Sequence, residues 1–310
     1  MNDHRDTQGM SSTCPFCAGV VERHLDLVVD SQSGDDFAID RCQVCGLGIT
    51  DPAPEQLDRY YGPEYVGERH GFTARICDRR RVGIVHKQMA DSQDRRILDV
   101  GCGDGTFMLA AARSGYDVSG VEKYSDIGRG GSLKIYDSLD SACTAGPYDC
   151  VTMWHVLEHM RDPETTVRQI KNLLAPGGVW IIAVPDFASV QARWFGAAWW
   201  HLDVPRHLYH FTTPALCRLL EGIGGDVRRL RRSEWEYDVM GWATSAVNGV
   251  DPESALLFKL MTRRRTDASF ARRVAALGMG AVVAMAVAIP VGIAGRLGRG
   301  GTIVASVRFP

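Results

Sequence analysis

The chain has 310 residues, of which 45% are hydrophobic and 23% are charged. This composition is that of a globular protein, and the length suffices for one large α/β domain with an accessory module. The formal net charge of −2 and the pI near 6.5 exclude a strongly basic protein, so nucleic-acid binding would need a local basic patch.

Two C-x-x-C pairs stand near the start of the chain, with 24 residues between them. The first pair is Cys14 and Cys17, and the second is Cys42 and Cys45. Four thiolates at this spacing predict a closed tetrahedral Zn²⁺ site, which is structural because it leaves no coordination position open. We therefore predict a zinc ribbon over residues 10–50; the alternative is a set of four buried cysteines without a metal.

The cysteine content also bears on the compartment. Nine cysteines, four of them in the two pairs, fit a metal site with free thiols better than a disulfide framework. The first residues lack the basic and apolar stretches of a signal sequence. We expect a reducing, cytoplasmic environment.

Residues 51–93 are predicted to form a linker and a helical lid. The aromatic segment after the ribbon holds Tyr60, Tyr61 and Tyr65, which either pack the ribbon against the main domain or cover a ligand. A basic helical pattern follows over residues 72–89, and its arginines are expected to form a solvated face.

Residues 97–105 read ILDVGCGDG, an apolar strand that runs into three alternating glycines. Glycine allows positive φ and close approach of a ligand to the backbone. A dinucleotide fingerprint would need glycine in place of Thr106, and the Gly-Lys-Ser/Thr of a P-loop is missing. We expect a loop for a different nucleotide-type cofactor; an ordinary glycine-rich turn is the alternative.

Further strands are predicted at 117–121, 133–136, 148–154, 179–184, 226–237 and 302–309. Most alternate with helical patterns, which predicts an α/β fold with a mostly parallel sheet and ligands at the carboxyl ends of its strands. Glu122 ends the strand at 117–121, about 20 residues beyond the glycine loop, where a carboxylate can bind a ribose diol.

Four segments resemble the class I S-adenosylmethionine-dependent methyltransferases in order and spacing: ILDVGCGDG, VSGVEK, YDCVTMWHVLEHMRDP and LLAPGGVWIIAVPD. The cysteine pairs and YYGPEY are similar to a bacterial subgroup with an N-terminal zinc module, often associated with sugar, glycan or lipid modification. The resemblance implies a Rossmann-like sheet with an antiparallel last strand, and a cofactor-binding domain over residues 94–237 plus 301–310. It also implies S-adenosylmethionine contacts from Asp99, Gly101, Cys102, Gly103, Glu122, Lys123, Met153, Trp154 and His155.

A hydroxyl acceptor must lose a proton during methyl transfer, and a positioned histidine can accept it. His155 follows the strand at 148–154, while His207 and His210 lie in WWHLDVPRHLYHF, which resembles a substrate-side segment of the same subgroup. We predict His207 as the base, with His155 second and His210 as a further candidate. The alternative is that these histidines pack and cap a loop.

Glu158 and His159 resemble residues that hold a divalent metal in a related quinone-biosynthesis group of methyltransferases. The upstream acid of that group is replaced here by Met153 or Trp154. We therefore expect Glu158 and His159 to cap and pack a helix.

Residues 238–300 are predicted to form a helical insertion before the last strand. The uncharged stretch 274–295 is long enough to cross a bilayer, but both ends of the insertion return to one domain. Eight basic and four acidic residues in the insertion favour an apolar hairpin at the anionic inner face of the cell membrane. Packing on the domain or in a dimer is the alternative.

Together these features predict a methyltransferase that acts on a hydroxyl of a glycan, a glycolipid or a comparable small metabolite. An RNA methyltransferase that docks RNA on the ribbon is an alternative, disfavoured by the acidic residues between the cysteine pairs. An aminopropyl transferase is a further alternative, but it would need an acidic pocket to bind a polyamine. The histidine-rich loop does not match such a pocket. A non-catalytic cofactor-binding scaffold protein is the remaining alternative.

Overall fold

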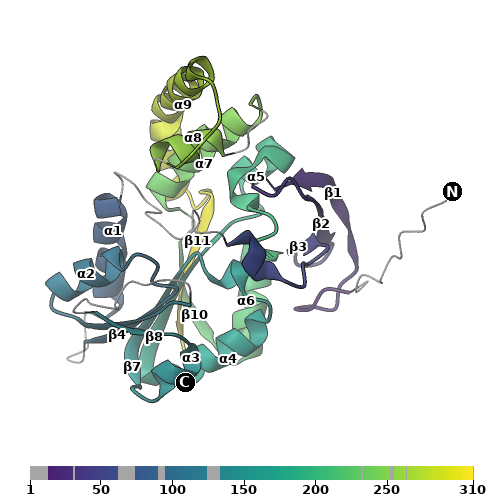
Figure 1. Cartoon of the computed structure of the whole chain (residues 1–310). Helices are drawn as coiled ribbons and strands as arrows, with labels where there is room; N and C mark the ends of the chain where they lie inside the picture. Colours follow the sequence, from purple (N-terminus) through teal and green to yellow (C-terminus); the bar gives the residue numbers. More distant parts are fainter. Residues whose placement is uncertain are drawn as a thin grey trace.

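The computed structural model describes residues 13–30, 32–61, 74–89, 95–123, 133–231, 233–251, 255–262 and 264–309. Figure 1 shows a central sheet with helices on both sides, a smaller N-terminal sheet beside it, and a helical group at the top of the view. Tyr65, one of the three tyrosines singled out above, lies outside the described residues.

The N-terminal sheet is antiparallel, in the order β1-β2-β3-β9. Its strands are β1 (Val21–Val29), β2 (Asp36–Cys42), β3 (Gly48–Asp51) and β9 (Tyr209–His210). The first three belong to the predicted ribbon, whereas β9 comes from the far end of the main domain. The histidine-rich loop before β9 is therefore fixed to the ribbon by backbone pairing.

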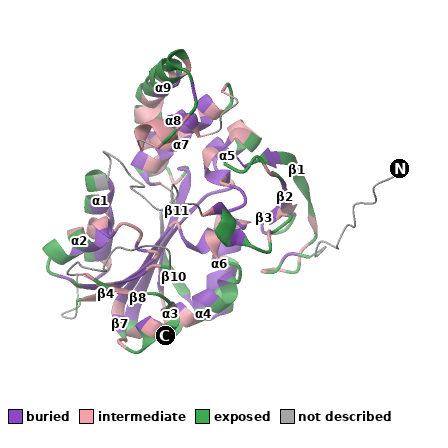
Figure 2. Ribbon diagram, viewed as in Figure 1, coloured by how far each residue is buried: buried purple, intermediate pink, exposed green. Residues whose placement is uncertain are grey.

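The main sheet has seven strands in the order β10-β11-β8-β7-β4-β5-β6. Strands β4 to β8 are parallel, and β11 pairs antiparallel with both β8 and β10, which confirms the expected methyltransferase-type sheet. Figure 2 shows its central strands as buried. The bounds are β4 (Arg96–Val100), β5 (Asp117–Val121), β6 (Lys134–Tyr136), β7 (Tyr148–Trp154), β8 (Leu174–Pro185), β10 (Asp226–Arg231) and β11 (Thr302–Arg308).

Side-chain caps fix where several helices begin. Asp162 accepts a hydrogen bond from the Thr165 amide at the start of α4, and Thr212 accepts one from Ala215 at the start of α6; each helix has proline in its first turn. The helices around the sheet are α1 (Ala74–Gln88), α2 (Thr106–Arg113), α3 (Leu139–Cys143), α4 (Pro163–Leu173), α5 (Val190–Phe195) and α6 (Thr213–Gly222). Short 3-10 turns are η1 (Leu57–Tyr60), η3 (Leu157–His159), η4 (Gly196–Ala198) and η5 (Trp200–Leu202).

The strand predicted over residues 226–237 is too long. It ends at Arg231, and α7 (Trp235–Asn248) begins shortly after it. The turn between them buries Glu234 against the basic side chains of Arg80 and Arg81, a charge pairing between distant segments that local strand propensity does not encode.

The insertion contains α7, α8 (Leu256–Met261) and α9 (Phe270–Arg296). Its apolar stretch is one continuous helix that packs on α7 and α8, and not a hairpin. The glycines in it do not break the helix. Gly280 allows α8 to pack closely, since a Cβ there would lie 2.5 Å from a methyl carbon of Leu257. Helix packing therefore outweighs the weak helical propensity of these residues.

Candidate active site

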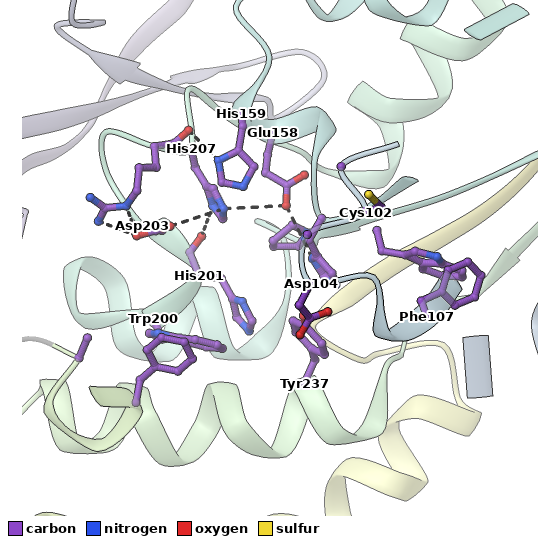
Figure 3. Close-up of a pocket in the computed structure, with 18 of the residues that line it drawn as sticks. Cys102, Asp104, Phe107, Glu158, His159, Trp200, His201, Asp203, His207 and Tyr237 are labelled. Carbon is purple, nitrogen blue, oxygen red and sulfur yellow. Dashed lines mark hydrogen bonds and ion pairs between the residues drawn. The ribbon is translucent and has the colours of Figure 1, made fainter. Parts of the chain in front are cut away.

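A pocket opens at the carboxyl ends of β4 and β7, where ligands of parallel sheets are expected. The glycine loop forms one wall, and loop residues 200–207 with α7 and α8 form the others. In Figure 3, Cys102, Asp104 and Phe107 lie on one side of this pocket. Glu158 and His207 lie on the other side, and Tyr237 lies below.

The glycine loop has a backbone that other residues would not adopt easily. Gly101, Gly103 and Gly105 have φ values of +71°, +54° and +73°. A Cβ on Gly101 would lie only 2.4 Å from a methyl carbon of Val156. The loop therefore presents bare backbone to the pocket, as a cofactor cradle requires.

Asp99 and Glu122 support this loop. Asp99 is buried and accepts a 2.6 Å hydrogen bond from the Thr152 hydroxyl; burial raises the pKa of Asp99 to about 7. Glu122 accepts a 2.8 Å hydrogen bond from the Gly103 amide. The carboxylate at the end of β5 thus helps to hold the glycine loop in place.

Most of the predicted cofactor residues come together in the pocket. Those that line it are Asp99, Gly101, Cys102, Gly103, Trp154 and His155. Glu122 lies beside the loop, so its contact with a ribose stays a prediction. The other two residues do not line the pocket. Met153 is fully buried in the core, and the Nζ of Lys123 lies 3.4 Å from a carboxylate oxygen of Asp58 on the surface.

His155 is held between two carboxylates. Its Nε2 lies 2.6 Å from an oxygen of Glu234, its Nδ1 lies 3.6 Å from Glu158, and its ring stacks on Tyr237 at 4.4 Å. Burial alone would lower the pKa of His155, but its close contacts with the negatively charged Glu158 and Glu234 outweigh burial and raise that pKa. The raised pKa favours the imidazolium, so this residue is better suited to donate than to accept a proton.

The sequence did not predict the arginines that complete this cluster. Arg81 is buried and lines the pocket, and Arg80 is half-buried in ion pairs with Glu234 and Glu236. The expectation of a solvated arginine face on residues 72–89 is therefore wrong for these two. Their partners stand about 150 residues later, and no local pattern links the two segments.

His207 shows the opposite arrangement to His155. Its Nδ1 lies 2.9 Å from the backbone carbonyl of His201, a partner that accepts only, so we assign the proton to Nδ1. Its Nε2 lies 3.9 Å from Glu158 and 4.0 Å from Asp203, beyond hydrogen-bond distance of either. A lone pair on a histidine nitrogen that faces a pocket is the arrangement of a general base.

His210 does not reach the pocket. Its Nε2 lies 3.0 Å from the Thr50 hydroxyl, where it joins β9 to β3, and burial lowers the pKa of His210 to about 3. Its position does not support the catalytic candidacy predicted from the sequence. The structure brings in His201 instead, which lines the pocket and is kept neutral by burial, with its pKa lowered to about 3.

The four ribbon cysteines fit a zinc ion. The sulfur atoms all lie within 4.8 Å of one another, at 3.6 Å for Cys14 and Cys45 and 3.4 Å for Cys17 and Cys42. Sulfurs bound tetrahedrally at about 2.3 Å from zinc would lie roughly 3.8 Å apart. The amides of Val44 and Cys45 both point at the sulfur of Cys42, each at 3.4 Å, as expected for a thiolate ligand.

A second group of donor atoms lies in the pocket itself. Glu158, His159 and His207 each offer an atom within 4.8 Å of the others. Both carboxylate oxygens of Glu158 are buried without a hydrogen-bond partner among the described residues. Glu158 therefore lines the pocket, which contradicts the expectation that it caps a helix. The group has the donor atoms for a divalent cation, but a cation held there would occupy the Nε2 lone pair of His207 that a general base needs.

Comparisons with known proteins agree with this geometry. A family model described as a methyltransferase domain matches residues 72–230. The ubiquinone biosynthesis O-methyltransferase of Psychrobacter arcticus is 36% identical over 158 residues, covering 43% of this chain and 60% of the relative. The protein of the same name from Bordetella avium is 39% identical over 113 residues, covering 33% and 46%. The chain thus matches about half the length of these curated relatives.

A solved structure resembles most of the chain. It is 1,6-didemethyltoxoflavin-N1-methyltransferase of Burkholderia thailandensis, with bound 1,6-didemethyltoxoflavin and S-adenosylhomocysteine. The alignment covers 93% of this chain and 99% of that one, at 15% identity and a TM-score of 0.47.

Proposed function

Since the chain belongs to the class I S-adenosylmethionine-dependent methyltransferases, we propose that it transfers the cofactor's methyl group to a hydroxyl oxygen of a small metabolite. The observation that carries the proposal is the orientation of His207, which offers a base to an acceptor in the pocket. The names of the curated relatives, which are O-methyltransferases, favour oxygen as the acceptor atom.

The glycine loop is the proposed holder of the cofactor, through Asp99, Gly101, Cys102 and Gly103. S-adenosylmethionine supplies an electrophilic methyl group on a sulfonium. An in-line transfer needs the acceptor oxygen aligned with that methyl group, so a rigid cradle on one wall and a fixed base on the other are what the chain must provide.

His207 is the proposed general base. Its Nδ1–H is committed to the His201 carbonyl, so its Nε2 is the atom free to take the hydroxyl proton. Glu158, whose carboxylate lies 3.9 Å from that nitrogen, would stabilise the imidazolium once it forms. An amine acceptor already protonated at neutral pH would need the same base, but the relatives favour oxygen.

His155 is the proposed donor on the same wall. Because Glu234 and Glu158 favour its protonated form, it would orient the acceptor or stabilise negative charge that develops on the oxygen. This role replaces the base function first considered for it.

The acceptor side of the pocket suggests a class of substrate. Trp200, Tyr237 and Phe258 supply aromatic surface, and Lys259 and Arg264 supply positive charge. We favour an acceptor that carries a ring or apolar portion and an anionic group near the hydroxyl. Lipid-linked and glycan-linked hydroxyls with a phosphate or carboxylate meet this description, as do smaller metabolites.

Calorimetric titration of the zinc-replete protein with S-adenosylmethionine and S-adenosylhomocysteine tests the first half of the proposal. We expect micromolar binding, about −8 kcal/mol. Gly101→Arg should abolish it, because any side chain at Gly101 meets Val156. Gly222→Arg is the matched control, since its site has open space, and it should bind normally.

The second half is tested with S-adenosylmethionine that carries a labelled methyl group and a panel of anionic hydroxy compounds. Mass spectrometry of the product should find a methyl ether. Methylation confined to nitrogen or carbon would reject the O-methyltransferase proposal, and a folded protein that binds neither cofactor form would reject the enzyme altogether.

A further inference from the structure

Helix α9 carries an exposed apolar stripe along its outer face. The helix has 27 residues and a mean hydropathy of 2.3 in its most apolar window, only 17% of which is buried. Met285 and Ile289 are 72% and 75% exposed, and the same face continues through Val274, Leu277, Val282 and Ile293. Figure 2 shows α9 as mostly exposed or intermediate at the edge of the molecule. A large exposed apolar surface of this kind needs a covering partner.

The opposite face of α9 explains why the helix is stable without being a core helix. Ala276 and Val291 are buried, and Ala276 belongs to a small apolar cluster with Leu256 and Leu257 of α8. The indole N–H of Trp235 in α7 donates a 2.9 Å hydrogen bond to the carbonyl of Ala288. One side of α9 is therefore packed against the domain along much of its length, and the outer stripe remains exposed.

Both ends of α9 are tied to the same folded body, which decides how it can meet a membrane. Its start follows α8, and its end leads within six residues into β11, in the interior of the seven-stranded sheet. A helix that crosses a bilayer would need its ends on opposite sides. Lying in the interface, with the stripe toward the acyl chains, is the orientation that this connection permits.

Basic residues flank the stripe. Arg265 and Arg273 are exposed near its start, and Arg296 and Arg299 are exposed near its end. The described part of residues 256–299 contains seven basic residues and one acidic residue, Asp267. Two copies of α9 packed side by side would bring these positive ends together in either direction, whereas an anionic surface complements them.

We propose that the outer face of α9, with its flanking arginines, is a docking surface for the headgroup layer of an anionic phospholipid bilayer. Helix α8 connects this surface to the pocket: Phe258 and Lys259 line the pocket, while Leu257 of the same helix contacts α9 at Gly280. If the methyl transfer proposed above is correct, docking would hold the acceptor side of the pocket next to the membrane, which suits an acceptor that partitions into lipid.

Flotation with vesicles tests the proposal on the full chain. One set of vesicles contains phosphatidylcholine with about one third phosphatidylglycerol, and the other contains phosphatidylcholine alone. We expect the protein to float with the anionic set, and much less in 1 M salt, because salt screens the arginines. Ile289→Glu should lower binding at least about tenfold, since it removes a lipid-buried side chain and adds a repelled charge.

Ile76→Glu is the matched control, an isoleucine on α1 that is 55% exposed, and it should float like the wild type. Cofactor titration of both variants verifies that they are folded. A wild type that stays unbound with either vesicle set overturns the proposal. A stable dimer that Ile289→Glu dissociates also overturns it, because a second copy would then be what covers the stripe.

Discussion

The guanidinium of Arg206 lies 2.8 Å from the carboxylate of Asp30, and both side chains are buried. Asp30 directly follows strand β1, while Arg206 precedes the proposed base His207. Thr50 of β3 adds a second tie, because its hydroxyl donates a 2.6 Å hydrogen bond to the His207 carbonyl. The ribbon therefore holds the histidine loop by a buried ion pair and by contacts to its backbone. Although the ribbon carries no catalytic group, it helps to position the proposed base His207.

Asp30→Asn should weaken this tie without changing side-chain volume. Loss of a buried ionic partner costs about 3 kcal/mol of unfolding free energy. Asp203 would still pair with Arg206, at 2.8 Å, after the substitution. We expect kcat to fall while the dissociation constant of S-adenosylmethionine stays the same, because the glycine loop is untouched. Asp26→Asn, at an exposed aspartate on β1, should change neither the unfolding free energy measured in urea nor kcat measured in steady-state kinetics.

The predicted zinc site has a separate test. The protein should hold one equivalent of zinc by elemental analysis, and Cys45→Ser should lose it, whereas serine at the exposed Cys143 should not. Without the ion, hydrogen exchange should rise in β1 to β3 and turnover should fall about 100-fold, as expected when a base is displaced. Normal turnover in a protein shown to be free of zinc would mean that the zinc-bound ribbon does not position the active site.

The sequence predicted the parts of this molecule that depend on local pattern. The glycine loop and the strands at 148–154 and 302–309 follow from apolar periodicity and glycine spacing, which act over a few residues. The antiparallel direction of the last strand was implied by the family resemblance. The charged network of the pocket could not be predicted from local patterns, because Arg81, Glu234 and His155 come from segments far apart in the chain. Their pairing depends on tertiary contacts that a single sequence does not display.

The same limit explains why the sequence could not tell His207 and His210 apart. His207 and His210 are three residues apart in a loop, and nothing in their spacing tells which one faces the pocket. Pairing of β9 with β3 decides it, since this pairing directs the ring of His210 toward Thr50.

His207→Gln should separate chemistry from binding. Glutamine keeps a polar side chain but cannot accept the hydroxyl proton, so we expect kcat to fall between about 10²- and 10⁴-fold with cofactor affinity unchanged. His210→Gln provides the comparison from the same loop. It should lower thermal stability, because it disturbs the contact with Thr50, and leave kcat within a few-fold of the wild type. Equal losses of kcat in both variants would argue that the loop only packs.

His155 should make stability depend on pH in a defined direction. Glu158, Glu234, the neighbouring Arg81 and the ring of Tyr237 surround it, and the two glutamates raise its pKa above the ordinary value of about 6.5. Because the folded-state pKa is the higher one, the stabilisation is fully present below about pH 6.5 and is lost as the pH rises through the folded-state pKa. The unfolding free energy of His155→Gln, measured in urea at several pH values, should therefore lie furthest below that of the wild type near pH 6. The gap should narrow toward pH 9. A gap that widens over this range would mean that His155 is neutral in the folded protein, and its proposed role as a donor would then have to be abandoned.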